Sequence, residues 1–454
     1  MKKIENRAVV CFLLALALAV GMVFFLFRYL TQGGSWASAA FNRHLYNSQG
    51  QLITGTVLDR DGDVLSSAEN GERTYYGNET VRKATLHAVG DLQGNVGAGA
   101  LNAFADRLTG WNLLNGAFGA DRGGELTLTI DARCNYEAYQ ALNGHAGTVA
   151  VYNYKTGEVL CMVSAPSYDP LHVPEDIETG DRWKGAYVNR FLSSVFTPGS
   201  VYKTVTLAAA LENLPALESR TWNCAGSVRI GEETIICSGV HGEQDIAAAF
   251  ANSCNAVFAD IAVELGAETL RKYTEQAGLT AAYRLDGLTA AKGSFDWNLT
   301  EGRLGWAGVG QDRDLVNPCA LMVYMGAIAN GGRAAEPYLI LKPGNGLLSL
   351  PRRTGRTGRL IASDTAETLA ELMAGNVEKT YGRDRFPNMD LCAKSGTAEV
   401  GEGKSPHAWF AGFLRNEDAP LAFVALVENG GGGSAVAGNV AARVLNVMVN
   451  GYEK

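Results

Sequence analysis

The sequence predicts an α+β fold, in which a large body of helices packed on an antiparallel sheet follows a small α+β module and one membrane helix. Three observations lead to this prediction. A long uncharged apolar run lies near the N-terminus, helical patterns fill the middle of the chain, and strand patterns return near its end. With 454 residues, 47% of them hydrophobic, the chain can bury a large core in more than one domain.

The N-terminal segment is typical of an uncleaved membrane anchor. Residues 8–27 carry no charge, and twenty helical residues span about 30 Å, the thickness of the hydrocarbon layer of a bilayer. The alternative is a signal peptide, but the cleavage-like ASA at 37–39 lies well beyond the apolar run. Basic residues precede the run, so we expect residues 1–7 in the cytoplasm, a span at 8–28 and everything after it outside the cytoplasm.

The rest of the chain divides into three predicted parts. Residues 29–50 predict a polar juxtamembrane stalk. Residues 51–130 mix short strand-like and helical runs with many turn residues, which favours a small α+β module. Residues 131–454 form the predicted body, whose late strand patterns lie at 407–414 and 421–429.

Composition and cysteine spacing argue against several classes of protein. The net charge is −8 and no basic stripe or RNA-binding motif occurs, which disfavours a nucleic-acid partner. The eight cysteines are dispersed singly, unlike those of a small disulfide scaffold. Cys224 and Cys237 bracket a predicted hairpin, where a disulfide and two buried thiols are both compatible with the sequence. No two cysteines have metal-ligand spacing with a histidine, so we expect no metal and no cofactor.

A serine and a lysine near residue 200 form the first candidate catalytic pair. In FTPGSVYKTVTLAAALE, Ser200 begins a helical pattern and Lys203 follows three residues later, so both side chains share one face. A serine hydroxyl becomes a nucleophile when a base takes its proton, and a lysine that burial keeps partly neutral can do this. The helix N-terminus also favours an oxyanion on the substrate. A capping serine with a surface lysine is the alternative, but this lysine lies in an otherwise apolar run.

The second candidate group is Ser253-Cys254-Asn255, which interrupts a helical pattern. Residues two apart in an extended turn point the same way, so Ser253 and Asn255 can face one cleft. Ser253 could relay a proton between the lysine and a leaving group, while Asn255 holds a substrate amide. An ordinary helix–helix loop with local caps is the alternative.

The third group precedes the strand pattern HAWFAGF and consists of Lys394, Ser395, Gly396 and Thr397. Its small residues would let a substrate backbone lie alongside, and Lys394 would lower the pKa of the Lys203 amine and attract a substrate carboxylate. Lys155-Thr156-Gly157 fits the same pattern, but it lies in the turn of a predicted hairpin at 147–167, before Ser200. Only Lys394 completes the order S-x-x-K, S-x-N, K-[ST]-G, and the ordered set is far more specific than each triplet.

These three motifs resemble those of the penicillin-binding protein and serine β-lactamase superfamily. The stretch GTVLDRDGDVL at 55–65 is similar to one near the start of class B penicillin-binding proteins, and GVGQ at 308–311 also matches that family. The resemblance runs from about Gly55 to the C-terminus and is to the short, penicillin-binding-protein-A-like branch. It implies the transpeptidase fold of the superfamily. It also implies a peptidoglycan D,D-transpeptidase that forms a serine acyl-enzyme, releases the terminal D-alanine of a stem peptide and is covalently inhibited by β-lactams.

The resemblance assigns a role to each motif residue. The backbone N–H groups of the nucleophile and of the last motif residue would form the oxyanion hole. The implied catalytic residues are Ser200, the nucleophile, Lys203, its base, Ser253, Asn255 and Lys394, and the implied substrate-binding residues are Ser395, Gly396 and Thr397.

Partners follow from the same resemblance. It implies peptidoglycan stem peptides as substrates, β-lactams as covalent inhibitors and no cofactor. The stretch between membrane and body is too short for a glycosyltransferase domain, so we expect a partner to polymerise glycan, and family precedent points to a SEDS-type polymerase. The alternatives are a β-lactam sensor or hydrolase on the same fold and a non-catalytic cell-wall scaffold. A carboxypeptidase would differ only in its acceptor.

Overall fold

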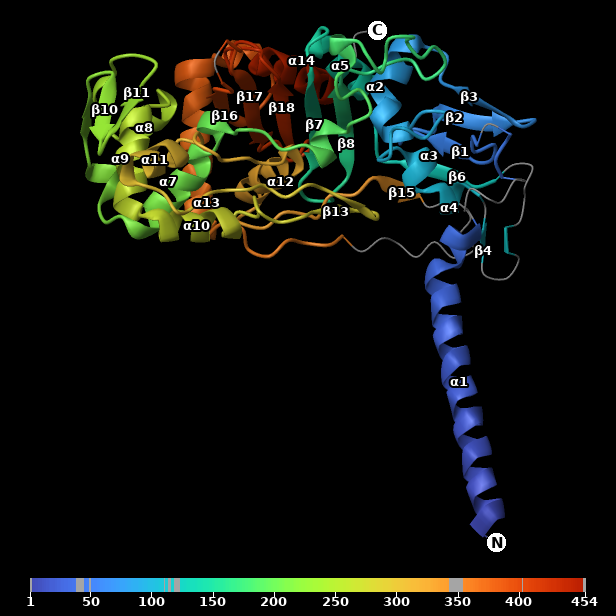
Figure 1. Cartoon of the computed structure of the whole chain (residues 1–454). Helices are drawn as coiled ribbons and strands as arrows, with labels where there is room; N and C mark the ends of the chain where they lie inside the picture. Colours follow the sequence, from blue (N-terminus) through green and yellow to red (C-terminus); the bar gives the residue numbers. More distant parts are fainter. Residues whose placement is uncertain are drawn as a thin grey trace.

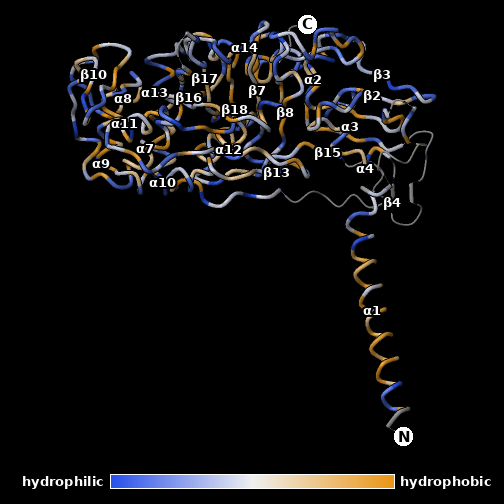
Figure 2. Tube along the Cα trace, in the orientation of Figure 1, coloured by the Kyte–Doolittle hydropathy of each residue, from blue (hydrophilic) through white to orange (hydrophobic). Residues whose placement is uncertain are grey.

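An N-terminal helix, α1 (Lys2–Ala37), projects away from the rest of the chain, with its side chains from Ile4 to Phe27 exposed (Figure 1). Hydrophobic residues cover most of this helix (Figure 2), and its length and composition fit a single membrane span. The helix continues past residue 28, so the first part of the predicted stalk is helical. Residues 38–44 and 49 of that stalk lie outside the described residues. The computed structural model describes residues 2–37, 45–48, 50–109, 111–112, 116–117, 123–342, 354–401 and 403–451.

Of the two five-stranded sheets, the one nearer to α1 has the order β15–β6–β1–β2–β3 (Figure 1). β1 pairs parallel with β6 and antiparallel with β2, while β15, from much later in the chain, pairs antiparallel with β6. The strands are β1 (Thr56–Leu58), β2 (Val64–Glu69), β3 (Glu72–Tyr75), β6 (Glu125–Leu128) and β15 (Ile340–Lys342). The neighbouring elements are α2 (Glu79–Val89), α3 (Ala100–Ala103), α4 (Ala105–Leu108), and the strand pair β4 (Trp111–Asn112) and β5 (Gly116–Ala117).

The body contains a second five-stranded sheet, in which every neighbouring pair is antiparallel and the order is β16–β17–β18–β7–β8. The predicted hairpin at 147–167 and both late strands are confirmed. All seven residues of β18 are buried because helices cover both faces of the sheet, which explains the unbroken apolar sequence LAFVALV. The strands are β7 (Gly147–Asn153), β8 (Val159–Ala165), β16 (Leu391–Ala398), β17 (His407–Leu414) and β18 (Leu421–Val427). Helices α5 (Ala132–Leu142) and α14 (Ala437–Asn450) cover one face, and α12 (Pro318–Ala329) covers the other.

Helices make up most of the body beyond the sheet. The pattern at 245–266 is interrupted as predicted, since α8 ends at Ala251 and α9 begins at Asn255. The helices are α6 (Arg190–Ser193), α7 (Lys203–Asn213), α8 (Ile246–Ala251), α9 (Asn255–Leu265), α10 (Ala267–Gln276), α11 (Glu301–Gly308) and α13 (Ser363–Asn376). The short turns are η1 (Asp181–Trp183), η2 (Gly199–Val201), η3 (Leu217–Ser219), η4 (Val377–Tyr381) and η5 (Arg383–Arg385). The described part of the body also contains small antiparallel pairs: β9 (Trp222–Cys224) with β12 (Gly242–Gln244), β10 (Ser227–Ile230) with β11 (Glu233–Ile236), and β13 (Arg284–Leu285) with β14 (Leu288–Thr289).

The three motifs meet where this helical part touches the sheet. Helix α7 packs against α9, and the turn η2 at its start packs against β16, the edge strand of the body sheet. Residues Lys203 to Ala210 of α7 are all buried, so the helix that begins with the first motif is enclosed by the body.

Candidate active site

Close backbone packing fixes the turn that carries Ser200. The serine lies in η2, which leads directly into α7. Gly199 has φ +55°, a left-handed conformation that favours glycine, and a Cβ there would lie 2.8 Å from the carbonyl oxygen of Thr397. The backbone N–H of Gly199 donates to the carbonyl oxygen of Gly310 at 2.8 Å. The glycine before the serine therefore lets the first motif lie directly against the third.

The amine of Lys203 is fully buried and contacts the second motif. Its Nζ donates to the carbonyl oxygen of Ser253 at 2.6 Å, to Ser253 Oγ at 3.3 Å and to Asn255 Oδ1 at 2.7 Å. It also lies 5.4 Å from the centre of the Phe258 ring. Burial lowers the pKa of the Lys203 amine to about 7, so a large fraction of it is neutral at neutral pH.

Ser253, in the loop between α8 and α9, and Asn255, the first residue of α9, converge on the Lys203 amine. Ser253 has φ +54°, an uncommon conformation for a residue with a Cβ, and its N–H donates to the carbonyl oxygen of Phe250 at 3.2 Å. The side-chain Nδ2 of Asn255 donates to the carbonyl oxygen of Ile236 at 2.7 Å. The strained turn thus directs the serine hydroxyl and the asparagine oxygen to the same lysine amine.

Lys394 brings a second buried amine to Ser253. Its Nζ donates to Ser253 Oγ at 3.0 Å and to the carbonyl oxygen of Ser395 at 3.1 Å. Burial and the charge of Lys203 lower the pKa of Lys394 well below its ordinary value. The sequence predicts that the charge of Lys394 lowers the pKa of Lys203. In the structure burial is the main cause of the low Lys203 pKa, and it is the charge of Lys203 that lowers the pKa of Lys394. The Ser253 hydroxyl therefore lies between two buried amines.

The third motif lies on the edge strand β16. Ser395 and Thr397 line a cavity, while Gly396 supports the turn that carries Ser200, since a Cβ there would lie 2.9 Å from the carbonyl oxygen of Pro198. An edge strand with small residues can also pair with an extended peptide.

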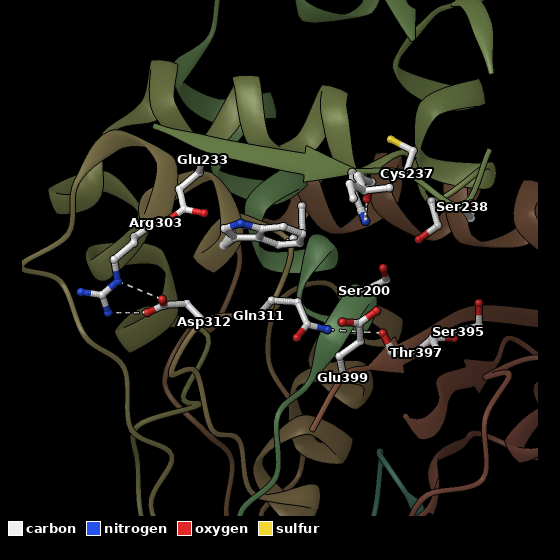
Figure 3. A pocket seen from close by; sticks show the side chains of 15 residues that line it. Ser200, Glu233, Cys237, Ser238, Arg303, Gln311, Asp312, Ser395, Thr397 and Glu399 are labelled. Carbon is white, nitrogen blue, oxygen red and sulfur yellow. Dashed lines mark hydrogen bonds and ion pairs between the residues drawn. The ribbon is translucent and has the colours of Figure 1, made fainter. Parts of the chain in front are cut away.

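The predicted residues meet at one cavity of about 820 Å³ (Figure 3). This volume suits a small ligand or part of a peptide. Lys203 and Lys394 lie beneath its surface and reach it through Ser253. The predicted residues that line it are Ser200, Ser253, Asn255, Ser395 and Thr397.

Several residues of the site are not predicted by the sequence analysis. Arg303 and Asp312 form a two-point ion pair of 2.9 and 2.7 Å at one end of the cavity, and Gln311 Nε2 donates to the carbonyl oxygen of Thr397 at 3.4 Å (Figure 3). The Tyr381 hydroxyl accepts from the backbone N–H of the third-motif serine at 2.8 Å and donates to its Oγ at 3.1 Å. The GVGQ stretch could have signalled the glutamine, but no local pattern marks the tyrosine. The other lining residues are Glu233, Ile236, Cys237, Ser238, Trp306, Val309 and Glu399.

Four side chains of the kind that bind metals also meet beside the second motif. They are Cys224, Cys237, His241 and Cys254. The sequence predicts no metal site here, but Cys237 and His241 are four positions apart, and the fold brings Cys224 and Cys254 to them. Cys224 and Cys237, for which the sequence leaves a disulfide open, are free thiols with sulfur atoms 3.6 Å apart.

This arrangement suits transfer of an acyl group. It combines a serine at the surface of a cavity, a partly neutral amine three residues later, and a hydroxyl that connects that amine to a second one. Lys155, which fits the third pattern by sequence, is exposed in the turn between β7 and β8 and does not line the cavity.

Comparison with known proteins gives one consistent family. Residues 147–446 match the family described as the penicillin binding protein transpeptidase domain. The chain is 30% identical over 373 residues to the peptidoglycan D,D-transpeptidase PbpA of Mycolicibacterium smegmatis, covering 76% of each protein. It is 29% identical over 384 residues to PbpA of Mycobacterium tuberculosis, covering 77% of this chain and 78% of that protein.

Solved structures agree with this result. The imipenem acyl-enzyme complex of penicillin-binding protein A from M. tuberculosis matches with a TM-score of 0.75 and 26% identity, covering 90% of this chain and 99% of that chain. The D,D-transpeptidase domain of a peptidoglycan glycosyltransferase from Eggerthella lenta matches with a TM-score of 0.74 and 26% identity, covering 87% of this chain and 98% of that chain.

Proposed function

This chain belongs to the penicillin-binding protein transpeptidase family, and from that premise we infer that it is a peptidoglycan D,D-transpeptidase. It cross-links stem peptides through a serine acyl-enzyme and is inhibited covalently by β-lactams. Penicillin-binding protein A from M. tuberculosis forms such acyl-enzymes with penicillin G and imipenem. The observation that carries this function is the Ser253 hydroxyl held between the amines of Lys203 and Lys394, in a cavity that Ser200 also lines.

Acylation starts at Ser200. Neutral Lys203 takes the proton of Ser200 Oγ, which attacks the carbonyl carbon of the penultimate D-alanine of the donor peptide. The backbone N–H groups of Ser200 and Thr397 stabilise the oxyanion that forms. When the amide C–N bond breaks, the proton passes from Lys203 through Ser253 Oγ to the leaving amine, and the terminal D-alanine departs. The acyl-enzyme keeps the new Oγ–C bond.

Transfer to the acceptor reverses these roles. The acceptor amine attacks the acyl carbon and gives its proton to Lys203, which returns a proton to Ser200 as the Oγ–C bond breaks. With a β-lactam, the same attack opens the ring amide, but the released amine stays attached to the acyl group. It therefore blocks the approach of an acceptor, and the enzyme stays acylated.

Substrate recognition falls to the rest of the motifs. The donor backbone pairs with β16, the edge strand of the body sheet that carries the small residues of the third motif. The terminal carboxylate lies near the hydroxyls of Ser395 and Thr397, which line the cavity. Asn255 holds a substrate amide from the opposite side of the cavity.

The anchor sets where this reaction happens. Helix α1 crosses the membrane with residues 1–7 in the cytoplasm and the catalytic body outside, where peptidoglycan is cross-linked. A SEDS-type polymerase that contacts the span and the small module would supply the new glycan strands. The exposed apolar surface of α1 is available for such a contact.

Labelling of the full-length protein with a fluorescent penicillin tests the chemistry. We expect persistent labelling of the wild type and of Ser193→Ala, which changes an exposed serine of α6, and none of Ser200→Ala. Mass spectrometry of muropeptides made from lipid II with a polymerase present should then show cross-linked dimers. Labelling that survives Ser200→Ala would refute the proposal. Trimmed peptides without dimers would indicate a carboxypeptidase, and rapid release of the label a hydrolase.

A further inference from the structure

Three sulfur atoms and one imidazole nitrogen converge behind the second motif. Cys224 ends β9, Cys237 follows β11, and His241 precedes β12. Cys254 is the middle residue of the second motif itself. The four ligand-type atoms all lie within 4.8 Å of one another, although they come from four places in the chain.

Three of the six separations among these atoms match the edges of a tetrahedron around a zinc ion, and all six lie within 4.8 Å. The sulfur of Cys237 is 3.6 Å from that of Cys224 and 3.7 Å from that of Cys254, and the sulfur of Cys224 is 3.5 Å from Nδ1 of His241. Tetrahedral zinc with bonds of about 2.3 Å to sulfur and about 2.0 Å to nitrogen places its ligands roughly 3.5–3.8 Å apart. All three cysteines are free thiols, so their sulfur atoms are available to a metal.

Backbone groups around the sulfurs suit thiolate ligands. The N–H of Gly226 donates to the sulfur of Cys224 at 3.4 Å, and the N–H of Ala256 donates to that of Cys237 at 3.1 Å. Such second contacts orient metal ligands and stabilise their negative charge. Cys224 and Cys254 are buried, so the cluster is enclosed on the side of the protein core.

We propose that Cys224, Cys237, His241 and Cys254 bind one Zn²⁺ ion in a closed, four-ligand site. Thiolate and imidazole ligands in a tetrahedral arrangement favour zinc over the hard cations magnesium and calcium, which prefer oxygen. With all four positions filled by protein, the ion has no open position for substrate and acts structurally. Binding converts the three thiols to thiolates and releases their protons to solvent.

The zinc site fixes the position of the second motif, because one of its ligands belongs to that motif. Its ligand Cys254 lies between Ser253, which adopts the strained φ of +54°, and Asn255, and both of these contact the Lys203 amine. Asn255 is also tied to the carbonyl oxygen of Ile236, the residue before Cys237. The ion therefore joins the two segments that hold the proton-relay hydroxyl in place. This positioning role rests on the proposed function, whereas metal binding does not.

Metal analysis of the full-length protein, purified in detergent, tests the site directly. We expect about one zinc ion per chain in the wild type and in Cys11→Ala, which changes a cysteine of the membrane helix, and a large loss of zinc in Cys237→Ala and His241→Ala. Replacement of the zinc by Co²⁺ in the wild type should give the visible bands of tetrahedral cobalt and a thiolate-to-cobalt charge-transfer band. This measurement needs no variant, so a variant that fails to fold leaves the test intact.

Two results would overturn the proposal. One is a wild-type chain without zinc and without the cobalt bands after metal exchange. The other is an intact mass, measured without reductant, that shows the hydrogen loss of a disulfide in place of bound metal, with peptide mapping that places this disulfide between Cys224 and Cys237.

The effect of zinc on catalysis is measured by the rate of penicillin labelling. Removal of zinc with a chelator should slow penicillin labelling by about tenfold, and Zn²⁺ but not Mg²⁺ should restore it. If a chain shown to have lost its zinc is labelled at an unchanged rate, the zinc ion does not position the second motif. A chain that binds zinc but is never labelled would contradict the proposed function and leave the metal site standing.

Discussion

Replacement of Lys203 by arginine should remove the catalytic base while it keeps a cation in the same place. An ordinary lysine amine, with a pKa of 10.5, is neutral at pH 7 in only about one molecule in 3,000, whereas a pKa of about 7 leaves about half of it neutral. Burial therefore raises the amount of neutral base by about a thousandfold. Arginine stays protonated, so we expect Lys203→Arg to lower the rate of acylation by a fluorescent penicillin by about 10²- to 10⁴-fold.

The wild-type rate should depend on pH in the corresponding direction. Because the neutral amine is the reactive form, the acylation rate should rise with pH and level off above the Lys203 pKa of about 7. Below that value each pH unit should lower the rate about tenfold, which gives about 1% of the plateau at pH 5.

Time courses of labelling at low penicillin concentration, between about pH 5 and 9, measure this profile. Lys155→Arg is the matched control, since it makes the same exchange in the exposed turn between β7 and β8. A rate that does not change between about pH 5 and 8, or a Lys203→Arg rate within about tenfold of the wild type, would refute Lys203 as the base.

Substitutions at three further positions test the geometry around that base. Ser253→Gly and Ser253→Ala should both slow labelling because both remove the hydroxyl. Thermal unfolding should show the glycine variant to be more stable than the alanine variant by about 1 kcal/mol, because a φ of +54° suits glycine, and equal stabilities would argue against strain. Gly199→Ala should abolish labelling because its Cβ would press on the Thr397 carbonyl, whereas Gly375→Ala, in α13 with open space around it, should keep labelling and raise the free energy of unfolding by up to about 1 kcal/mol. Tyr381→Phe leaves a backbone N–H of β16 without its partner, so denaturant unfolding should show a loss of about 1–3 kcal/mol together with slower labelling; if neither changes, the hydroxyl has no such role.

Short stretches of sequence were sufficient to predict a helix, strand or loop wherever the residue types and the periodicity of apolar residues indicated the same structure. The interruption of a helical pattern by Ser253 and Asn255 predicted the loop between α8 and α9, and the unbroken apolar run of β18 predicted a buried strand. The order of the three motifs then predicted that distant segments meet, and the structure brings Ser253 to both lysine amines. These features are visible in sequence because each depends on a few adjacent residues.

Features that arise only from tertiary packing were not predictable in this way. Tyr381 reaches β16 from a turn after α13, and nothing around it in the sequence distinguishes it from a core tyrosine. The Arg303–Asp312 pair joins residues nine positions apart whose charges look like ordinary surface charges. The four residues of the proposed zinc site have the spacing C-x12-C-x3-H-x12-C, and the β9–β12 and β10–β11 pairs bring the distant cysteines next to Cys237 and His241.

The strand β15 makes the small module and the catalytic body one mechanical unit. It pairs with β6 in the sheet of the small module, although in the sequence it comes after α12, a helix of the body. A fragment cut at residue 131 would leave β6 in one piece and β15 in the other, with an open sheet edge prone to aggregation. In the intact chain, the hydrogen bonds between β15 and β6 connect the module to the body. A movement of the module at the membrane is therefore transmitted to the body more directly than it would be through a flexible linker.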